Sequence, residues 1–158
     1  MKMKNSVEQA ICILIMLANQ SNQLPLKSTI ISRRLSVSDS YLKKVMRELV
    51  VSGLVLSESG REGGFRLLKA PKEITMLHIY EAIEGEKSFV RSSNLAEKVF
   101  INTDKVKSKK REVLDVFFDA EKQFKQRLQQ YNLESLLTEE NHKVDSINWK
   151  KLVSNENS

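Results

Sequence analysis

Two clusters of cationic and hydroxyl side chains lie in the first 70 residues of this 158-residue chain. One cluster falls within the ten residues 38–47, and the other lies in and just after a turn, 59–64, that holds three glycines. Hydroxyl, ammonium and guanidinium groups donate hydrogen bonds to phosphate oxygens and to the edges of bases, so these donors fit contact with a nucleic acid. The candidate contact residues are Ser38, Ser40, Tyr41, Lys43, Lys44, Arg47, Arg61 and Arg66.

These side chains differ in what they can recognise. Arg47 can pair bidentately with guanine, which is worth about 1–3 kcal/mol of discrimination, whereas the two lysines of the same cluster suit phosphate. Arg61, at the tip of the turn, suits a narrow minor groove with its enhanced negative potential. Two assignments stay open. Tyr41 either contacts the DNA backbone or packs against the first helix, and Arg66 either contacts phosphate or is an exposed strand residue.

The excess positive charge is confined to the same part of the chain. Residues 1–70 hold 11 Lys and Arg against five Asp and Glu, a net charge of +6, whereas residues 71–158 hold 15 of each. A basic segment joined to a neutral one indicates a polyanion-binding part and a part with another role. On charge alone, a solvated basic surface is an equally good interpretation.

The chain lacks the residue sets of common catalytic and metal sites. It has one cysteine, Cys12, and two histidines, His78 and His142, which we expect at the surface. A single thiol excludes a disulfide within the chain and a zinc site built on several thiolates. The glycine-rich turn lacks the strand-to-helix context of a nucleotide site. We therefore expect no enzyme activity, no catalytic residue, no metal and no cofactor.

Cys12 lies inside the longest apolar run, 10–18, which has nine residues. In such a setting cysteine behaves as a small hydrophobe, so we expect packing rather than a redox-sensing thiol, which would be partly exposed and near positive charge. The run is far shorter than the roughly 20 residues of a membrane span. With no signal-peptide pattern either, we expect a cytoplasmic protein with no membrane partner.

Apolar periodicity predicts the elements that position the first cluster. Residues 6–19, 28–35 and 39–52 have helical spacing, with Ser6 and Ser38 as N-caps of the first and third helices. Only three residues separate the second and third helices, which is the spacing of a helix-turn-helix. Strands at 54–57 and 65–68 follow, joined by the glycine-rich turn, and complete a winged-helix order.

The second half of the chain is predicted to be mostly helical. A helix at 76–84 has Thr75 as N-cap and Gly85 at its end, and residues 88–105 are predicted as a loop with some helix. Residues 107–131 would form a helix of roughly 37 Å. Its apolar stripe fits a second copy of the chain, or else a helix folded back on its own domain. After Leu137 we expect fraying, with Trp149 the one strong apolar anchor. The stripe consists of Val113, Phe117, Phe124, Leu128 and Tyr131.

Several linked motifs resemble those of the Rrf-two (Rrf2) family of bacterial winged-helix regulators, which includes IscR, NsrR and CymR. The segment 38–45 with Ser52-Gly53-Leu54-Val55 resembles the family's helix-turn-helix. The segment 59–67 resembles its wing, and 71–75 with Glu81-Ala82-Ile83-Glu84-Gly85 resembles the stretch after the wing. The resemblance covers about residues 6–85 and implies a homodimer that binds double-stranded DNA at an inverted repeat.

The chain departs from the family pattern at three places. Ser36 stands where glycine is common in the turn, Ser32 replaces a usual alanine, and residues 86–105 lack the cysteines by which some members bind an iron–sulfur cluster. Because thiolates hold such clusters, we expect this chain to be cluster-free.

The fold class expected is mainly α with a small β-hairpin wing. The expected parts are a winged helix-turn-helix domain at 1–85, a connector and effector region at 86–105, a dimerisation helix region at 106–138 and a polar tail at 139–158. We expect a DNA-binding transcriptional regulator, most simply a repressor. A small-molecule or protein effector would control it, and a small molecule would bind between the winged domain and the long helix. The alternative is a winged-helix protein-interaction module controlled by a partner protein.

Overall fold

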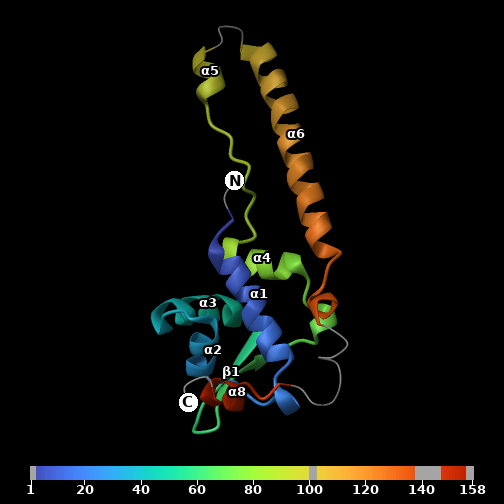
Figure 1. Ribbon diagram of the computed structural model, residues 1–158. Coiled ribbons are helices and arrows are strands. Elements are labelled where there is room, and N and C mark those ends of the chain that lie inside the picture. Colours follow the sequence, from blue (N-terminus) through green and yellow to red (C-terminus); the bar gives the residue numbers. More distant parts are fainter. Residues whose placement is uncertain (1–2, 100–102, 138–146, 156–158) are drawn as a thin grey trace.

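The computed structural model describes residues 3–99, 103–137 and 147–155. It has a compact lower body and a long helical arm that rises from it (Figure 1). In these residues the fold is mainly helical with one two-stranded hairpin, which confirms the expected fold class. The helices are α1 (Asn5–Ala18), α2 (Ser28–Leu35), α3 (Asp39–Val51), α4 (Met76–Glu84), α5 (Leu95–Val99), α6 (Thr103–Gln129) and α8 (Trp149–Asn155), and the strands are β1 (Val55–Glu58) and β2 (Gly64–Leu67).

Helix α1 lies at the centre of the core. Its residues Ala10, Ile13 and Leu14 are fully buried, and α4, α3 and β2 all pack against it. The helix begins one residue earlier than expected, with Lys4 and not Ser6 as its N-cap. The end of α4 explains this difference. The Lys4 backbone N–H donates to the Glu84 carboxylate at 2.7 Å, and the Lys4 ammonium donates to the Ile83 carbonyl at 2.9 Å.

Cys12 lies on a partly buried face of α1. Burial, assisted by the nearby negative charge of Glu8, raises the pKa of its thiol above the ordinary value. A raised pKa leaves less of the reactive thiolate at neutral pH, which fits the packing role expected from the sequence.

The turn between α2 and α3 is tight, as its length predicts. Ser36 adopts a left-handed conformation with φ 53°, the position where the resemblance leads one to expect glycine. The Val37 N–H donates to the Ser32 carbonyl at 3.1 Å and closes the turn. Ser38 then caps α3 as expected, its hydroxyl accepting from the Tyr41 N–H at 3.4 Å. Together these bonds fix the direction in which α3 leaves the turn.

The hairpin pairs β1 with β2 in antiparallel register, Val55 opposite Leu67 and Glu58 opposite Gly64. Each strand is displaced by one residue from its predicted position. A backbone bridge explains the displacement, because Leu26 exchanges hydrogen bonds of 2.8 and 2.9 Å with Phe65 and so pins β2 to the chain before α2. A Cβ atom on Gly64 would lie 2.7 Å from the Leu26 carbonyl oxygen, so only glycine allows this close approach.

Helix α4 begins with a reciprocal cap in which His78, a residue expected at the surface, takes part. The His78 N–H donates to the Thr75 hydroxyl at 3.2 Å, and the Thr75 N–H donates to His78 Nδ1 at 3.1 Å. Two free donors of the first turn are satisfied in this way, and the imidazole is half-buried. The other histidine, His142, lies outside the described residues.

Helix α6 starts and ends earlier than predicted, and its apolar stripe has two different environments. Tyr131 lies beyond the helix, where its carbonyl accepts from the Met76 N–H at 2.8 Å. Phe124 and Leu128 are half-buried, and the Phe124 ring meets Tyr80 of α4 edge to face at 5.2 Å. Val113 and Phe117, two turns and more towards the arm's tip, are 57% and 56% exposed. The lower half therefore folds back on its own domain, and the upper half does not.

The expectation that the chain frays after Leu137 is wrong for residues 147–155, whereas 138–146 lie outside the described residues; Trp149 is a buried anchor, as expected. Residues 147–155 dock on the body: the Ile147 N–H donates to the Asn19 carbonyl at 2.8 Å, and the buried Trp149 indole N–H donates to the Met16 carbonyl at 2.9 Å. Met16 lies in the last turn of α1, whose carbonyls have no partner within the helix. The segment thus completes the end of α1, a long-range role that local composition does not reveal.

Replacing Trp149 with alanine should detach α8 and destabilise the protein. Burial of the indole and its hydrogen bond together predict a loss of about 3 kcal/mol in the free energy of unfolding, because large-to-small changes at buried tryptophan cost about 3–5 kcal/mol. Urea denaturation followed by circular dichroism measures it. Lys150→Ala, an exposed neighbour, is the control, and equal stability of the two variants would mean that α8 does not dock.

The Cys12 thiol should react slowly with iodoacetamide at pH 8 in the native protein. Its raised pKa lowers the thiolate fraction, and burial limits access, so alkylation should accelerate when urea unfolds the chain. Because the native thiol ionises at higher pH, its alkylation rate should still increase at pH values at which the rate of the unfolded chain has stopped changing. A native rate equal to or above the unfolded rate would contradict the packing role.

Candidate nucleic-acid interface

Helix α3 has one buried face and one exposed face. Leu42, Val45, Met46 and Leu49 are buried in the core, which fixes the helix in rotation. All six residues that the sequence predicts as contacts on or before α3 are exposed: Ser38, Ser40, Tyr41, Lys43, Lys44 and Arg47. Within the part of the chain that the structure describes, no carboxylate pairs with Lys43, Lys44 or Arg47. These cations are therefore available to an external anion.

The hydroxyl residues of the cluster are not equivalent. Ser38 already accepts from the Tyr41 N–H as a helix cap, and its hydroxyl lies 3.3 Å from that of Ser40. Tyr41 is 37% exposed and stands outside the hydrophobic core, so the alternative in which it packs inside the protein is not favoured. The Tyr41 and Ser40 hydroxyls project from the first turn of α3, next to its basic residues.

The two arginines of the hairpin have different surroundings. Arg61 lies exposed at the tip, beside Gly60, whose φ of 103° requires a residue without a side chain. Arg66 lies on β2 and forms an ion pair with Glu58 of β1, and both side chains are partly exposed. The pair neutralises part of the Arg66 charge, whereas Arg61 has no such partner among the described residues. The geometry therefore favours Arg61 over Arg66 as the hairpin's contact.

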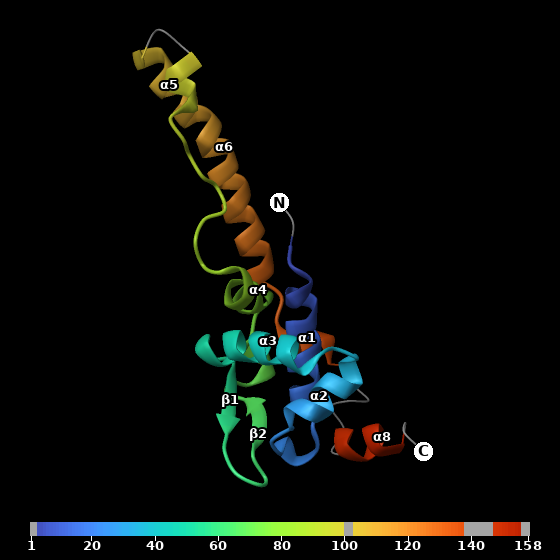
Figure 2. The same ribbon diagram turned by 90° about the vertical axis from the view of Figure 1, so that its left-hand side faces the viewer.

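The hairpin and α3 belong to one face of the molecule. Figure 2 shows α3 crossing the front of the body with β1 and β2 hanging below it at one side. Val55 and Leu54 are buried at the start of the hairpin, so its base is fixed in the core while its tip projects. A helix presented beside a projecting hairpin is the arrangement that fits a duplex, with the helix in the major groove and the tip on the neighbouring groove or backbone.

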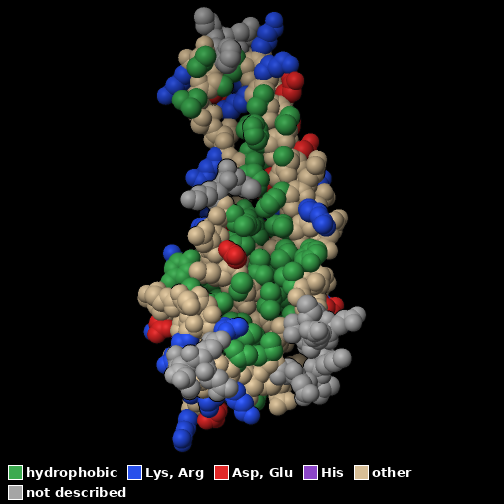
Figure 3. Space-filling view, in the orientation of Figure 1, with side chains coloured by type: hydrophobic (Ala, Val, Ile, Leu, Met, Phe, Trp, Pro, Cys, Tyr) green, Lys and Arg blue, Asp and Glu red, His purple; other side chains and the backbone are tan. Residues whose placement is uncertain are grey.

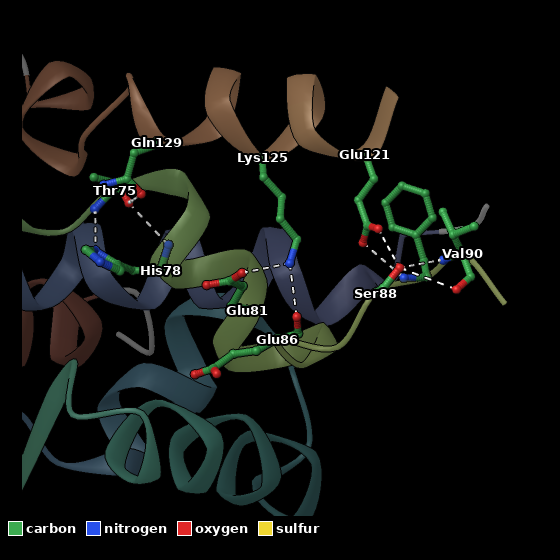
Figure 4. A network of polar contacts seen from close by, with 10 residues as sticks. Thr75, His78, Glu81, Glu86, Ser88, Val90, Glu121, Lys125 and Gln129 are labelled. Carbon is green, nitrogen blue, oxygen red and sulfur yellow. Dashed lines mark hydrogen bonds and ion pairs between the residues drawn. The ribbon is translucent and has the colours of Figure 1, made fainter. Parts of the chain in front are cut away.

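A polar network that sequence analysis missed joins α6 to the body (Figure 4). Lys125 reaches Glu81 of α4 at 3.1 Å and the Glu86 carbonyl at 3.0 Å. Glu121, only 6% exposed, accepts from the Ser88 hydroxyl at 2.5 Å and from the Phe89 N–H at 3.0 Å. Glu121 and Lys125 are one helical turn apart, a spacing visible in the sequence, but their partners lie more than 30 residues away.

A hollow of about 700 Å³ lies beside this network. Its walls are the end of α3, α4, the loop after α4 and one residue of α6. The lining includes Glu48, Val51, Tyr80, Phe89 and, from α6, Phe124. This is the region between winged domain and long helix where the sequence places a small-molecule effector. Its occupant stays a prediction. Because Glu48 and Val51 belong to α3, anything that fills the hollow touches the helix that carries the basic cluster.

Comparisons with known proteins agree with this geometry. A model of the Rrf2 family, described as an iron-dependent transcriptional regulator, matches residues 3–139. Over 100 residues the chain is 46% identical to YwgB of Bacillus subtilis (strain 168), named as an HTH-type transcriptional regulator; the match covers 63% of this chain and 64% of YwgB. It is also 36% identical to YffB of Lactococcus lactis subsp. lactis (strain IL1403), named likewise, over 70% of each chain.

Solved structures show the same fold. The CymR structure from B. subtilis, titled the global cysteine regulator of that organism, has a TM-score of 0.62 and 28% identity, with 86% of this chain and 95% of that chain covered. The T. potens IscR structure has a TM-score of 0.60 and 22% identity, and the match covers 87% of this chain and 86% of that chain. YwgB, YffB and CymR are named as regulators, which agrees, at the level of the family, with the expectation of a regulator and not an enzyme.

The family model's description raises the question of iron. Iron–sulfur clusters are held mainly by thiolates, yet this chain has a single cysteine, which lies partly buried on α1, and residues 86–105 contain none. Among the described residues, no three His, Cys, Asp or Glu side chains are placed together to hold a metal ion. The residues present do not fit such a cluster. In the same residues, no helix combines the length and apolarity needed to cross a membrane.

The resemblance found in the sequence is thus confirmed over most of the chain, from the first helix to the end of the long one. With a helix-turn-helix and hairpin on one face, a long helix rising behind them and a family match over residues 3–139, the chain belongs to the Rrf2 family of transcriptional regulators.

Proposed function

We propose that this protein is a homodimeric, cluster-free transcriptional repressor that recognises an inverted-repeat DNA operator. Recognition would place α3 in the major groove and the hairpin tip at the neighbouring minor groove. Lys43 and Lys44 would hold the phosphate backbone, and Arg47 would read a base, because arginine can pair with two acceptors of guanine at once. The hydroxyls of Ser38, Ser40 and Tyr41 would add contacts to the backbone.

The observation that carries this proposal is the exposed, unpaired basic face of α3. Three cations lie on it without a carboxylate partner among the described residues, while its opposite face is buried. Like charges gathered on one face repel one another, so their arrangement costs free energy unless an anion meets them. A duplex supplies one negative charge per about 1.7 Å of its length. The hairpin, which lies below α3 in Figure 2, adds the exposed Arg61 at its tip.

The upper half of α6 supports a homodimer. Val113, Val116 and Phe117 are 57%, 66% and 56% exposed, and Figure 3 shows hydrophobic side chains in a strip along the arm. Although α5 packs against this part of α6, these side chains stay exposed, and an exposed apolar strip of this kind is normally covered by a partner. A second copy is the simplest cover, since a two-fold axis pairs the same strip with itself. Phe124, Leu128 and Tyr131, predicted as dimer contacts, lie instead towards or on the body and would contribute less.

The symmetry of such a dimer determines the form of its operator. Two copies of α3 related by a two-fold axis would read the same base sequence on opposite strands. The operator would therefore be an inverted repeat with half-site centres about one helical turn apart. A protein that covers its operator excludes other proteins from that DNA, which is the action of a repressor.

Arg47→Ala and Arg61→Ala should each weaken binding to a selected operator duplex. Loss of a bidentate base contact costs about 1–3 kcal/mol, so Arg47→Ala should bind about 5- to 150-fold more weakly per half-site, and the base opposite Arg47 should lose its preference. Arg66→Ala is the control, because Arg66 is already paired with Glu58 and should change affinity much less. Fluorescence anisotropy with labelled duplexes measures all three dissociation constants.

Parent-like binding by both Arg47→Ala and Arg61→Ala would show that the contact residues are wrongly assigned. A parent affinity for DNA that hardly changes with salt would instead favour the protein-interaction module, because phosphate neutralisation makes DNA binding fall steeply as salt rises.

Phe117→Glu should convert the dimer to a monomer. The substitution places a charge in the centre of the apolar strip, where pairing would bury it without a partner. Asp115→Lys, on the opposite face of α6, is the control and should stay dimeric. Light scattering after size-exclusion chromatography gives the mass of each variant. A dimeric Phe117→Glu protein would place the interface elsewhere.

A further inference from the structure

The docked C-terminal helix α8 adds basic residues beside the helix-turn-helix. In Figure 1, α2, α8 and the hairpin overlap, whereas in Figure 2 they separate into a row with the hairpin at one side, α2 in the middle and α8 at the other. Helix α3 lies above this row. The body therefore has two flanks beside its recognition helix, one formed by the hairpin and the other by α8.

Helix α8 is held firmly enough to act as part of this face. Trp149 and Val153, one turn apart, are 8% and 3% exposed, and α8 packs against α2. The Arg34 guanidinium of α2 lies 5.7 Å from the centre of the Trp149 ring, which adds a cation–π contact across the seam. Asn148 caps the helix by accepting from the Lys151 N–H at 3.1 Å. The helix and the helix-turn-helix thus form one unit.

The exposed side of α8 is cationic. Lys150 and Lys151 are exposed, and the seven residues of α8 include no acidic side chain. In the described part of the chain neither lysine forms an ion pair. The neighbouring helix α2 likewise has no acidic residue and ends with Arg33 and Arg34. Helices α2 and α8 therefore carry cationic side chains and no acidic one.

We propose that α8 is a second DNA-contacting flank, in which Lys150 and Lys151 bind backbone phosphates on the side of α3 opposite the hairpin. This inference rests on the proposed DNA-binding function. In helix-turn-helix proteins the first helix of the motif crosses the backbone, so a helix packed against α2 on its outer side meets the phosphates beyond that crossing. Ammonium groups suit this role because they neutralise phosphate charge without reading sequence.

The test is a comparison of two double variants on the same selected operator. Lys150→Ala/Lys151→Ala removes the α8 charges, and Lys72→Ala/Lys122→Ala removes two exposed lysines that lie outside the α3, hairpin and α8 elements. Both double variants lower the net charge of the protein by the same amount, so its long-range attraction to DNA changes equally in the two. Circular dichroism confirms that α8 and the fold are retained. Anisotropy titrations at several salt concentrations then give the dissociation constant and its salt dependence.

The salt slope of the α8 variant should fall by about 2–4, because four lysines of a dimer each neutralise up to one phosphate, and its binding at 0.1 M salt should be roughly 100-fold weaker or more. Base preferences should not change. The control variant should keep the parent slope. If both variants behave alike while Arg47→Ala loses affinity, α8 is not a contact and the DNA-binding function stands. If the parent protein binds no duplex, the proposed function itself is wrong and the α8 contact falls with it.

Discussion

Burial of α1 is the constraint on which the rest of this structure depends. The helix has apolar residues on nearly every side, so it is stable only when other elements cover it. Helix α4 and α3 cover two sides, β2 covers another, and the C-terminal segment completes its last turn. These are the same elements that orient the exposed face of α3. The position of the basic cluster is therefore a consequence of how α1 is buried.

The long helix α6 has two roles in one element. Its lower half is fixed to the body by Phe124, which packs on Tyr80, and by Glu121 and Lys125, which hold the loop after α4. Its upper half leaves the body with apolar side chains exposed. The loop and α4 thus join the arm to the body, and α4 in turn packs directly against α3.

Local signals in the sequence were sufficient for much of the fold. The caps formed by Ser38 and Thr75 and the helix end at Gly85 depend on residues within one turn, and the structure confirms them. The exposure of the basic and hydroxyl side chains of α3 was predictable from the periodicity of its buried residues. The features that the sequence did not reveal have distant partners: Lys4 caps α1 because of Glu84, Glu121 is buried by the loop at 88–89, and Trp149 docks on Met16.

The apolar stripe of α6 shows the same limit in another form. Periodicity placed Val113, Phe117, Phe124 and Leu128 on one face correctly, but it could not tell which of them face their own domain. That distinction depends on where α4 and its loop lie. Of the residues of the stripe, it is Phe124 whose ring packs on Tyr80 of α4. The end of α6, which lies two residues before its predicted position, has a similar origin, because the chain after Gln129 is held by the Met76 and Ile74 backbone.

Selection from a random duplex library, followed by titration of the enriched sequence at several salt concentrations, shows whether the exposed face of α3 reads DNA. With purified and reduced protein, we expect enrichment of an inverted repeat with half-sites about one helical turn apart and an affinity that falls steeply as salt rises. No enrichment by protein that is folded and dimeric, or an affinity insensitive to salt, would contradict the claim that the exposed face of α3 reads DNA.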